Sequence, residues 1–219
     1  MLEIITGGSG SGKSELAEKL AVFWSESGSG CGGSSNGNKN NNNNKKLYYI
    51  AAMIPQDAEC HERIARHRLM RRDKGFQTVE CYYHLQELKL EPGSVALIEC
   101  LSNLLANEMY QEQGQLRAYH GESYSDKPYS GESRYHELYQ QADAAILEPI
   151  LELVKRDVHV IVVTNEIFSD GGEYDEETER YVGCLGWLNR ELSKRADLVV
   201  ESVCGIPLVQ KGELPCCNL

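Results

Sequence analysis

The chain has 219 residues, 41% of them hydrophobic, and a formal net charge of -11 at pH 7. This length suffices for one α/β domain with a substantial core, whereas the negative charge argues against broad binding to nucleic acid or an anionic membrane. The chain contains no run of 18 apolar residues and does not open on a signal-peptide pattern, so we expect a cytoplasmic protein.

The first predicted element is a strand at residues 2–6, and a glycine-rich turn follows it directly. The turn reads "GGSGSGKS" and matches the Walker A pattern G-x-x-x-x-G-K-[ST]. In this pattern backbone N–H groups surround the phosphates, the lysine reaches the β- and γ-phosphates, and the serine holds Mg²⁺. The predicted nucleotide-binding residues are Gly7, Gly8, Ser9, Gly10, Ser11, Gly12, Lys13 and Ser14. The alternative is a flexible Gly/Ser turn without a ligand.

A predicted helix at residues 14–24 follows, with Leu16, Leu20 and Phe23 on one face. Residues 25–46 then contain no aliphatic or aromatic side chain, so we expect a disordered loop there. Residues 111–141 form a second polar excursion, rich in Gly, Ser and Tyr. Because core strands are predicted on both sides of each segment, the sequence predicts one domain over residues 1–219.

The remaining strands are short, almost continuously apolar runs that alternate with helices. We expect strands at 47–52, 95–100, 158–164 and 196–203, and helices at 57–72, 144–156 and 179–196. Strands of this kind are typical of a parallel sheet that helices cover on both faces. The predicted fold class is therefore a doubly wound α/β domain.

Glu99 ends the predicted strand 95–100. An acidic residue at the end of a later strand is what a P-loop enzyme needs to orient Mg²⁺ and its water, so Glu99 joins Ser14 as a predicted metal residue. Judged without the P-loop, a carboxylate facing solvent is an equal alternative. Asn165 and Glu166 similarly follow the predicted strand 158–164, at the sheet edge where doubly wound folds bind ligands.

Arg63, His67 and Arg71 are spaced four residues apart in the predicted helix 57–72, and therefore share one stripe. Neighbouring cations disfavour protonation of an imidazole, which leaves His67 able to attack phosphorus while the arginines hold an anionic group. The product would be a nucleotidyl-histidine. The alternative is a solvated histidine on a basic helix.

Several motifs occur together in one order along the chain. After the Walker A segment come "YIAA", "ERIARHR", "TVE", "LIECLSNLLAN", "VVTNE", "GWLNRELSKRAD" and "VVESVCGIPL". This combination resembles the bifunctional adenosylcobinamide kinase / adenosylcobinamide-phosphate guanylyltransferase family of cobalamin biosynthesis. The chain departs from the family pattern in "RRDKGF" after the histidine and in "NEIFSDGGEYDEE" after residue 164.

The resemblance implies a P-loop NTPase fold of the RecA-like kind and two reactions. A nucleoside triphosphate, ATP or GTP, would phosphorylate adenosylcobinamide; GTP would then guanylylate His67, and the GMP would pass to adenosylcobinamide phosphate. The resemblance also implies that Glu80 binds nucleotide and that the chain forms a homo-oligomer, a trimer. Two other functions stay open: a P-loop kinase for another small molecule, and a regulatory NTP-binding switch.

Overall fold

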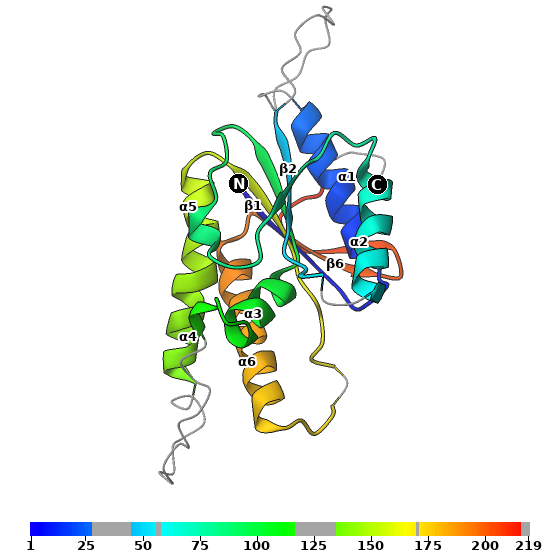
Figure 1. Ribbon diagram of the computed structural model, residues 1–219. Coiled ribbons are helices and arrows are strands. Elements are labelled where there is room, and N and C mark those ends of the chain that lie inside the picture. The colour runs from blue at the N-terminus through cyan, green and yellow to red at the C-terminus, as the bar shows by residue number, and fades with distance from the viewer. Residues whose placement is uncertain (28–44, 56–57, 117–134, 170, 216–219) are drawn as a thin grey trace, which may run out of the picture.

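The computed structural model describes residues 1–27, 45–55, 58–116, 135–169 and 171–215, apart from the side chains of Glu59, Arg63 and Met70. Seven strands form one sheet in the order β3-β2-β4-β5-β1-β6-β7 (Figure 1). All neighbouring strands are parallel except β7, which is antiparallel to β6. The strands are β1 (Leu2–Thr6), β2 (Leu47–Ala51), β3 (Gln77–Glu80), β4 (Val95–Glu99), β5 (His159–Val163), β6 (Leu198–Val203) and β7 (Ile206–Lys211).

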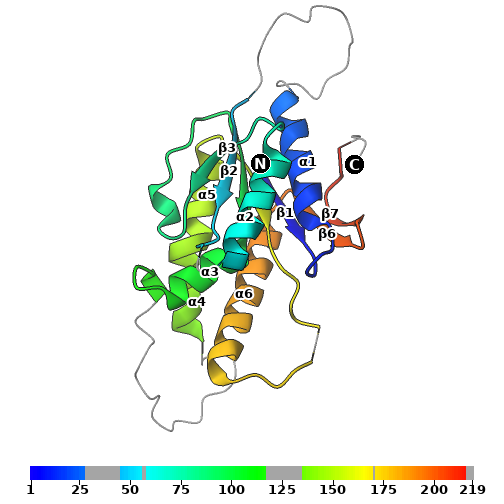
Figure 2. The ribbon, with the colours of Figure 1, turned by 45° about the vertical axis from the view of Figure 1, so that its right-hand side comes forward.

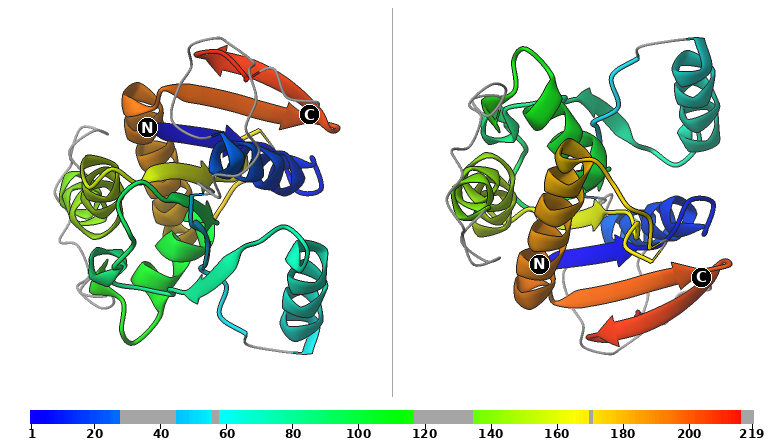
Figure 3. Two further views of the ribbon diagram at one scale, coloured as in Figure 1. Left: turned by 90° about the horizontal axis from the view of Figure 1, so that it is seen from above. Right: turned by 90° about the horizontal axis from the view of Figure 1, so that it is seen from below.

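Helices cover both faces of the sheet (Figure 3). One face carries α1 (Lys13–Glu26); the other carries α3 (Leu101–Tyr110), α5 (Glu148–Lys155) and α6 (Glu176–Arg195). In β1, Ile4 belongs to the core on the α6 side, whereas Ile5 belongs to the core beneath α1. Burial on both faces explains the apolar runs of the central strands, and the prediction of a doubly wound α/β fold is confirmed.

Helix α2 (Ala58–Arg71) lies on the same side of the sheet as α1, beside the β3 edge (Figure 3). Most of its described side chains are exposed or half-buried, and Leu69 is 69% exposed. Arg71, at its last position, is 5% exposed. Helix α2 is therefore held against the rest of the protein at its C-terminal end, through the buried side chain of Arg71.

Both predicted polar segments are partly ordered at their ends. Helix α1 continues through Ser25, whose hydroxyl donates to Val22 O at 2.8 Å. The second segment contains α4 (His136–Ala142), which continues through the π-helical turn η3 (Asp143–Leu147) into α5. Leu138 and Ala142 are buried, so a short apolar face is present within a polar composition. Residues 28–44, which make up most of the segment predicted to be disordered, and residues 117–134 of the second polar segment lie outside the described part.

Sequence analysis did not predict β3, α3 or β7 as elements. Strand β3 is mostly exposed, so it lacks the apolar run by which the central strands were recognised. Strand β7 returns antiparallel along β6 as the outer strand of the sheet (Figure 2). The turn between β6 and β7 contains Cys204 and Gly205 with φ of 52° and 79°, the left-handed conformations that two-residue hairpins need.

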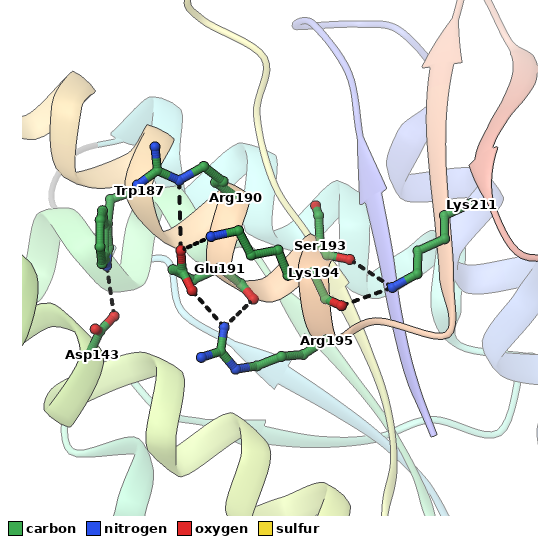
Figure 4. A network of polar contacts seen from close by, with 8 residues as sticks. All are labelled: Asp143, Trp187, Arg190, Glu191, Ser193, Lys194, Arg195 and Lys211. Atoms are coloured by element: carbon green, nitrogen blue, oxygen red, sulfur yellow. Dashed lines mark hydrogen bonds and ion pairs between the residues drawn. The ribbon is translucent and has the colours of Figure 1, made fainter.

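Helix α6 is stabilised at both ends. At its start, the Asp175 carboxylate accepts a hydrogen bond from Thr178 N at 2.8 Å. Near its end, Glu191 accepts from Lys194 at 2.6 Å and from Arg195 at 2.7 Å (Figure 4). Lys211 of β7 donates to the carbonyl oxygens of the last turn, including Lys194 O at 3.0 Å. These positive groups complement the negative end of the helix dipole.

Two further structural findings concern the described residues only. Their cysteines are free thiols: Cys60, Cys81, Cys100, Cys184 and Cys204. Their helices include none that is long and apolar enough to traverse a bilayer.

Candidate active site

The Walker A segment forms the turn between β1 and α1. Gly10 and Gly12 have φ of 70° and 88°, conformations that glycine adopts without steric cost. A Cβ atom on Gly7 would lie 2.6 Å from Ser202 O, so a side chain there would displace the turn. The first amide groups of α1 face this turn with the positive end of the helix dipole, an arrangement that favours bound phosphate.

Neighbouring strands hold this turn in place. Ser11 O accepts hydrogen bonds from Ser202 Oγ at 2.7 Å and from Gly205 N at 2.8 Å, both at the β6–β7 hairpin. On the other side, Gly7 O accepts from Glu166 N at 3.1 Å. The shape of the phosphate-binding turn therefore depends on two segments more than 150 positions away in the chain.

Lys13 lies inside the turn, and its ammonium group donates to Gly8 O at 3.0 Å. Burial lowers the pKa of Lys13, while the neighbouring Cys100 and Glu99 oppose that shift. An incoming phosphate would replace the Gly8 carbonyl as the partner of this cation and would favour its charged form.

Ser14 and Glu99 meet across the sheet, although β5 separates β1 from β4. The Ser14 hydroxyl donates to Glu99 Oε1 at 2.5 Å, and Glu99 Oε2 is buried without a hydrogen-bond partner. Mg²⁺ is commonly bound through a single carboxylate together with substrate phosphates and waters. A hydroxyl beside a carboxylate with an unsatisfied oxygen fits such an ion, and the described residues contain no cluster of three or more His, Cys, Asp or Glu that could hold a metal alone.

The segment after β5 connects the P-loop to the start of α3. Asn165 donates from Nδ2 to Ser102 Oγ at 2.8 Å, while Thr164 Oγ1 donates to Asn189 Oδ1 at 2.7 Å. Asn189, for which the sequence suggested no role, thus supports the buried Thr164 from α6. Ser102 could not be recognised from the sequence because its contact depends on the meeting of β5 and α3.

A cavity of about 240 Å³ adjoins the Ser14–Glu99 pair, between α2 and the carboxyl ends of β2, β3 and β4. Its volume is below the roughly 300–1,000 Å³ of typical drug-sized ligand sites, so it would enclose only part of a nucleotide. It is lined by Tyr49, Ala51, Met53, Pro55, His61, Ile64, His67, Arg68, Arg71, Thr78, Glu80, Tyr82, Glu99, Cys100 and Asn103.

Four residues proposed from the sequence lie on the wall of this cavity: His67, Arg71, Glu80 and Glu99. They come from α2, β3 and β4, which are separate segments of the chain. Arg63 is also in α2, but its side chain lies outside the described part. Glu99 both lines the cavity and accepts from Ser14, so the cavity and the P-loop are adjoining parts of one site.

Arg71 also has a structural role that the sequence did not suggest. Its guanidinium carbon lies 3.4 Å from the ring centroid of Tyr49, and Nη1 lies 3.8 Å from Glu18 Oε1. The ammonium of Lys74 lies 2.6 Å from the other oxygen of Glu18, and burial raises the pKa of Tyr49. Arg71 therefore attaches the histidine-bearing helix to α1 and β2 while it lines the cavity.

Glu80 is held at the end of β3 by two neighbours. Arg68 Nη2 donates to Glu80 Oε1 at 2.7 Å, and the Tyr82 hydroxyl donates to Glu80 Oε2 at 3.0 Å. Arg68 and Tyr82 also line the cavity. Sequence analysis missed both, although Arg68 directly follows His67 and Tyr82 lies two residues after the "TVE" motif.

Comparisons with known proteins match this architecture to one family. Residues 3–210 match the family described as "Cobinamide kinase / cobinamide phosphate guanyltransferase". The chain is 31% identical over 216 residues to the Bifunctional adenosylcobalamin biosynthesis protein CobP of Pseudomonas aeruginosa, covering 97% of this chain and 99% of that protein. It is 28% identical over 209 residues to the Bifunctional adenosylcobalamin biosynthesis protein CobU of Escherichia coli, covering 94% and 97% respectively.

The family match spans both the P-loop and the cavity that contains His67. The chain belongs to the cobinamide kinase / cobinamide phosphate guanyltransferase family.

Proposed function

We propose that this protein phosphorylates adenosylcobinamide with a nucleoside triphosphate and then transfers GMP from GTP, through His67, to the new phosphate. One observation carries the proposal. The Glu99 side chain is shared between the P-loop and the cavity that His67 lines, so a phosphate-binding turn and a candidate nucleophile adjoin. The family description names two such reactions, and the relatives are called bifunctional.

In the first reaction the hydroxyl oxygen of adenosylcobinamide attacks the γ-phosphorus. The bond from that phosphorus to the β–γ bridging oxygen breaks, the nucleoside diphosphate leaves, and the hydroxyl proton passes to solvent. The P-loop amides and Lys13 stabilise the charge on the phosphoryl oxygens. Ser14 and Glu99 would hold Mg²⁺, which when bound neutralises negative charge on the triphosphate.

In the second reaction an imidazole nitrogen of His67 attacks the α-phosphorus of GTP, and the bond to pyrophosphate breaks. A phosphate oxygen of adenosylcobinamide phosphate then attacks the same phosphorus. The phosphorus–nitrogen bond breaks, which releases adenosylcobinamide-GDP and restores the imidazole. We assign Arg71, Glu80 and, by its place on α2, Arg63 to nucleotide binding around His67. A covalent intermediate of this kind divides one transfer into two easier steps.

We also propose that the chain forms a homo-oligomer, as the resemblance implies. Light scattering of the purified protein tests this and the trimer in particular. The cytoplasmic location stays a prediction.

Labelling with GTP that carries a radioactive α-phosphate tests the main proposal. The denatured wild-type protein should retain label through a bond that is labile in acid and stable in base. His67→Ala should abolish this label but retain phosphorylation of adenosylcobinamide; Lys13→Ala should impair the phosphorylation. His136→Ala on α4, outside the cavity, is the matched control and should behave as wild type.

Each alternative has a distinct outcome in this experiment. Absence of label on wild-type protein that phosphorylates a small molecule would identify a simple kinase. Slow hydrolysis without transfer to either acceptor would identify a regulatory switch. Label that persists in His67→Ala and disappears in His61→Ala would move the nucleophile to His61, which lines the same cavity.

A further inference from the structure

Two adjacent polar residues near the end of α3 are buried, whereas the other buried residues of this helix, apart from Ser102, are apolar. Asn107 is 7% exposed and Glu108 is 1% exposed. Neither residue lines the cavity, and neither has a role in the two proposed reactions. Burial of an amide or a carboxylate is costly unless hydrogen bonds compensate it, so the partners of these residues indicate what they hold.

Asn107 uses its side-chain nitrogen to hold two separate parts of the chain. Nδ2 donates to Ala52 O at 2.8 Å and to Tyr82 O at 2.9 Å. Ala52 directly follows β2, and Tyr82 lies two residues after β3. Helix α3 lies close to the end of β2 in Figure 1, in agreement with these bonds. One carboxamide therefore joins the chain segments that leave two neighbouring strands.

These two segments are walls of the cavity that His67 lines. Met53 and Pro55 follow Ala52, while Glu80 and Tyr82 belong to the second segment. The strand ends are also joined to one another, since Cys81 N donates to Ala51 O and Ala52 N donates to Glu99 O, each at 3.0 Å. Asn107 therefore lies outside the cavity and contacts the backbone of the two segments whose side chains line it.

The chemistry of this position favours an amide. A carboxamide nitrogen carries two hydrogens and can satisfy two carbonyl oxygens, whereas an ionised carboxylate of the same shape only accepts hydrogen bonds. Aspartate at position 107 would place negative charge against two carbonyl oxygens. The segments that carry Met53 and Tyr82 would then separate or turn. Glu108 differs, because it accepts from His84 N at 2.9 Å and from Gln115 N at 2.7 Å, outside the cavity wall.

We propose that Asn107 is a positioning residue for guanylyl transfer, which sets the spacing of the two nucleotide-facing walls through Ala52 O and Tyr82 O. The proposal rests on the proposed function of the His67 cavity. It predicts that Asn107 affects the guanylyl-transfer reaction more than the phosphorylation reaction, because its hydrogen bonds reach the segments after β2 and β3 and none reaches the P-loop.

The test compares Asn107→Asp and Asn107→Ser with Ser94→Ala. Ser94 is 2% exposed, and its hydroxyl donates to Glu91 O at 2.6 Å at the opposite end of β4, so its removal deletes a partly buried hydrogen bond far from the site. For each variant, kcat and KM are measured for guanylyl transfer from GTP and for phosphorylation of adenosylcobinamide, together with the melting temperature. Serine at position 107 retains one hydrogen-bond donor. This variant replaces the aspartate variant in the test if the latter does not fold.

We expect kcat/KM for guanylyl transfer to fall about 10- to 100-fold in the Asn107 variants, mainly through the KM for GTP, with phosphorylation changed less than about threefold. Equal losses in both reactions that follow the melting temperature, as a merely structural residue would cause, would overturn the proposal. Unchanged KM for GTP would do so as well. In both of these outcomes the wild-type protein is still labelled at His67 by GTP that carries a radioactive α-phosphate. Absence of that label from the wild type would instead overturn both the proposed function and this inference.

Discussion

The Ser14 hydroxyl donates a hydrogen bond to Glu99 Oε1 at 2.5 Å, although the two residues are 85 positions apart. They come from the start of α1 and the end of β4, with β5 between the two strands. The other oxygen of Glu99 is buried and unpaired. This relationship joins the phosphate-binding turn to the cavity that contains His67, and the first prediction concerns it.

Glu99→Gln should lower the rate of adenosylcobinamide phosphorylation about 100-fold, because the amide retains the size of the side chain but lacks the negative charge that would hold Mg²⁺. Initial rates measured over a range of Mg²⁺ concentrations check this. Glu91→Gln is the control, since Glu91 pairs with Lys46 at the other end of the sheet. An unchanged rate in Glu99→Gln would contradict the assignment of Glu99.

Glu18→Gln should weaken the attachment of α2. The Glu18 side chain is 4% exposed and faces both Arg71 and Lys74, and loss of one partner from a buried pair leaves the other charge uncompensated. We expect the free energy of unfolding in urea to fall by about 3 kcal/mol. Glu15→Gln, on the same helix and 61% exposed, should change it by less than about 0.5 kcal/mol. Similar changes in both variants would show that the contacts of Glu18 with Arg71 and Lys74 contribute little to stability.

Glu3 and His159 form a second buried pair, between β1 and β5 beneath α1. Glu3 Oε1 lies 3.1 Å from His159 Nε2, and the ring of Trp24 lies 4.9 Å from the imidazole. His159→Phe retains a ring but removes the nitrogen beside the buried Glu3 carboxyl group, and should lower the free energy of unfolding by about 1–3 kcal/mol. Adding Glu3→Leu should recover most of this loss, since two apolar groups can replace a buried polar pair of similar shape at little cost. No recovery in the double variant would contradict the pairing.

Glu191 should contribute a pH-dependent part of the stability. Hydrogen bonds from Arg195, then from Lys194, lower the pKa of Glu191 from 4.5 to about 2. Since its pKa is lower in the folded state, its stabilisation is complete above about pH 4.5 and is lost as the pH falls towards 2. Glu191→Gln should reduce stability at pH 7 by about 1 kcal/mol, as expected for a pair near the surface.

Urea unfolding at several pH values checks the Glu191 prediction. Between pH 4.5 and 2 the wild type should lose more stability than Glu191→Gln, whose amide does not titrate. Glu152→Gln serves as the control, because within the described part of the chain Glu152 pairs with the exposed Lys155 of the same helix, α5. Identical pH profiles for wild type and Glu191→Gln would contradict a low pKa at Glu191.

The central strands and the P-loop could be predicted from sequence because their signals are local. Strand 2–6 was predicted with the bounds that the structure shows, and the four other predicted strands differ by one or two residues at an end. Each is a short apolar run, a pattern that burial on both faces of a sheet produces by itself. Strand β3 and the hairpin strand β7 were missed because exposed edge strands carry no such pattern.

The candidate site was also predictable only in part: residues with a local sequence signal could be proposed, and residues without one could not. Lys13, Ser14, Glu99 and His67 could be proposed because each belongs to a motif or a strand end within a few residues. Arg68 and Tyr82 on the cavity wall, and Asn107 behind it, could not, since their partners lie on other elements. Arg63, His67 and Arg71 all lie in α2, as their helical spacing predicted, but spacing could not show that Arg71 also contacts Tyr49 and Glu18.

The sequence by itself determined the parallel α/β class, the phosphate-binding turn and the histidine to be tested, because glycine conformation, helical spacing and apolar runs act within a few residues of the chain. Only the tertiary structure decided that Glu99 serves both the P-loop and the His67 cavity, and that Asn107 supports the walls of that cavity. The order of the strands sets these contacts, and strand order depends on packing between distant segments, which no local pattern encodes.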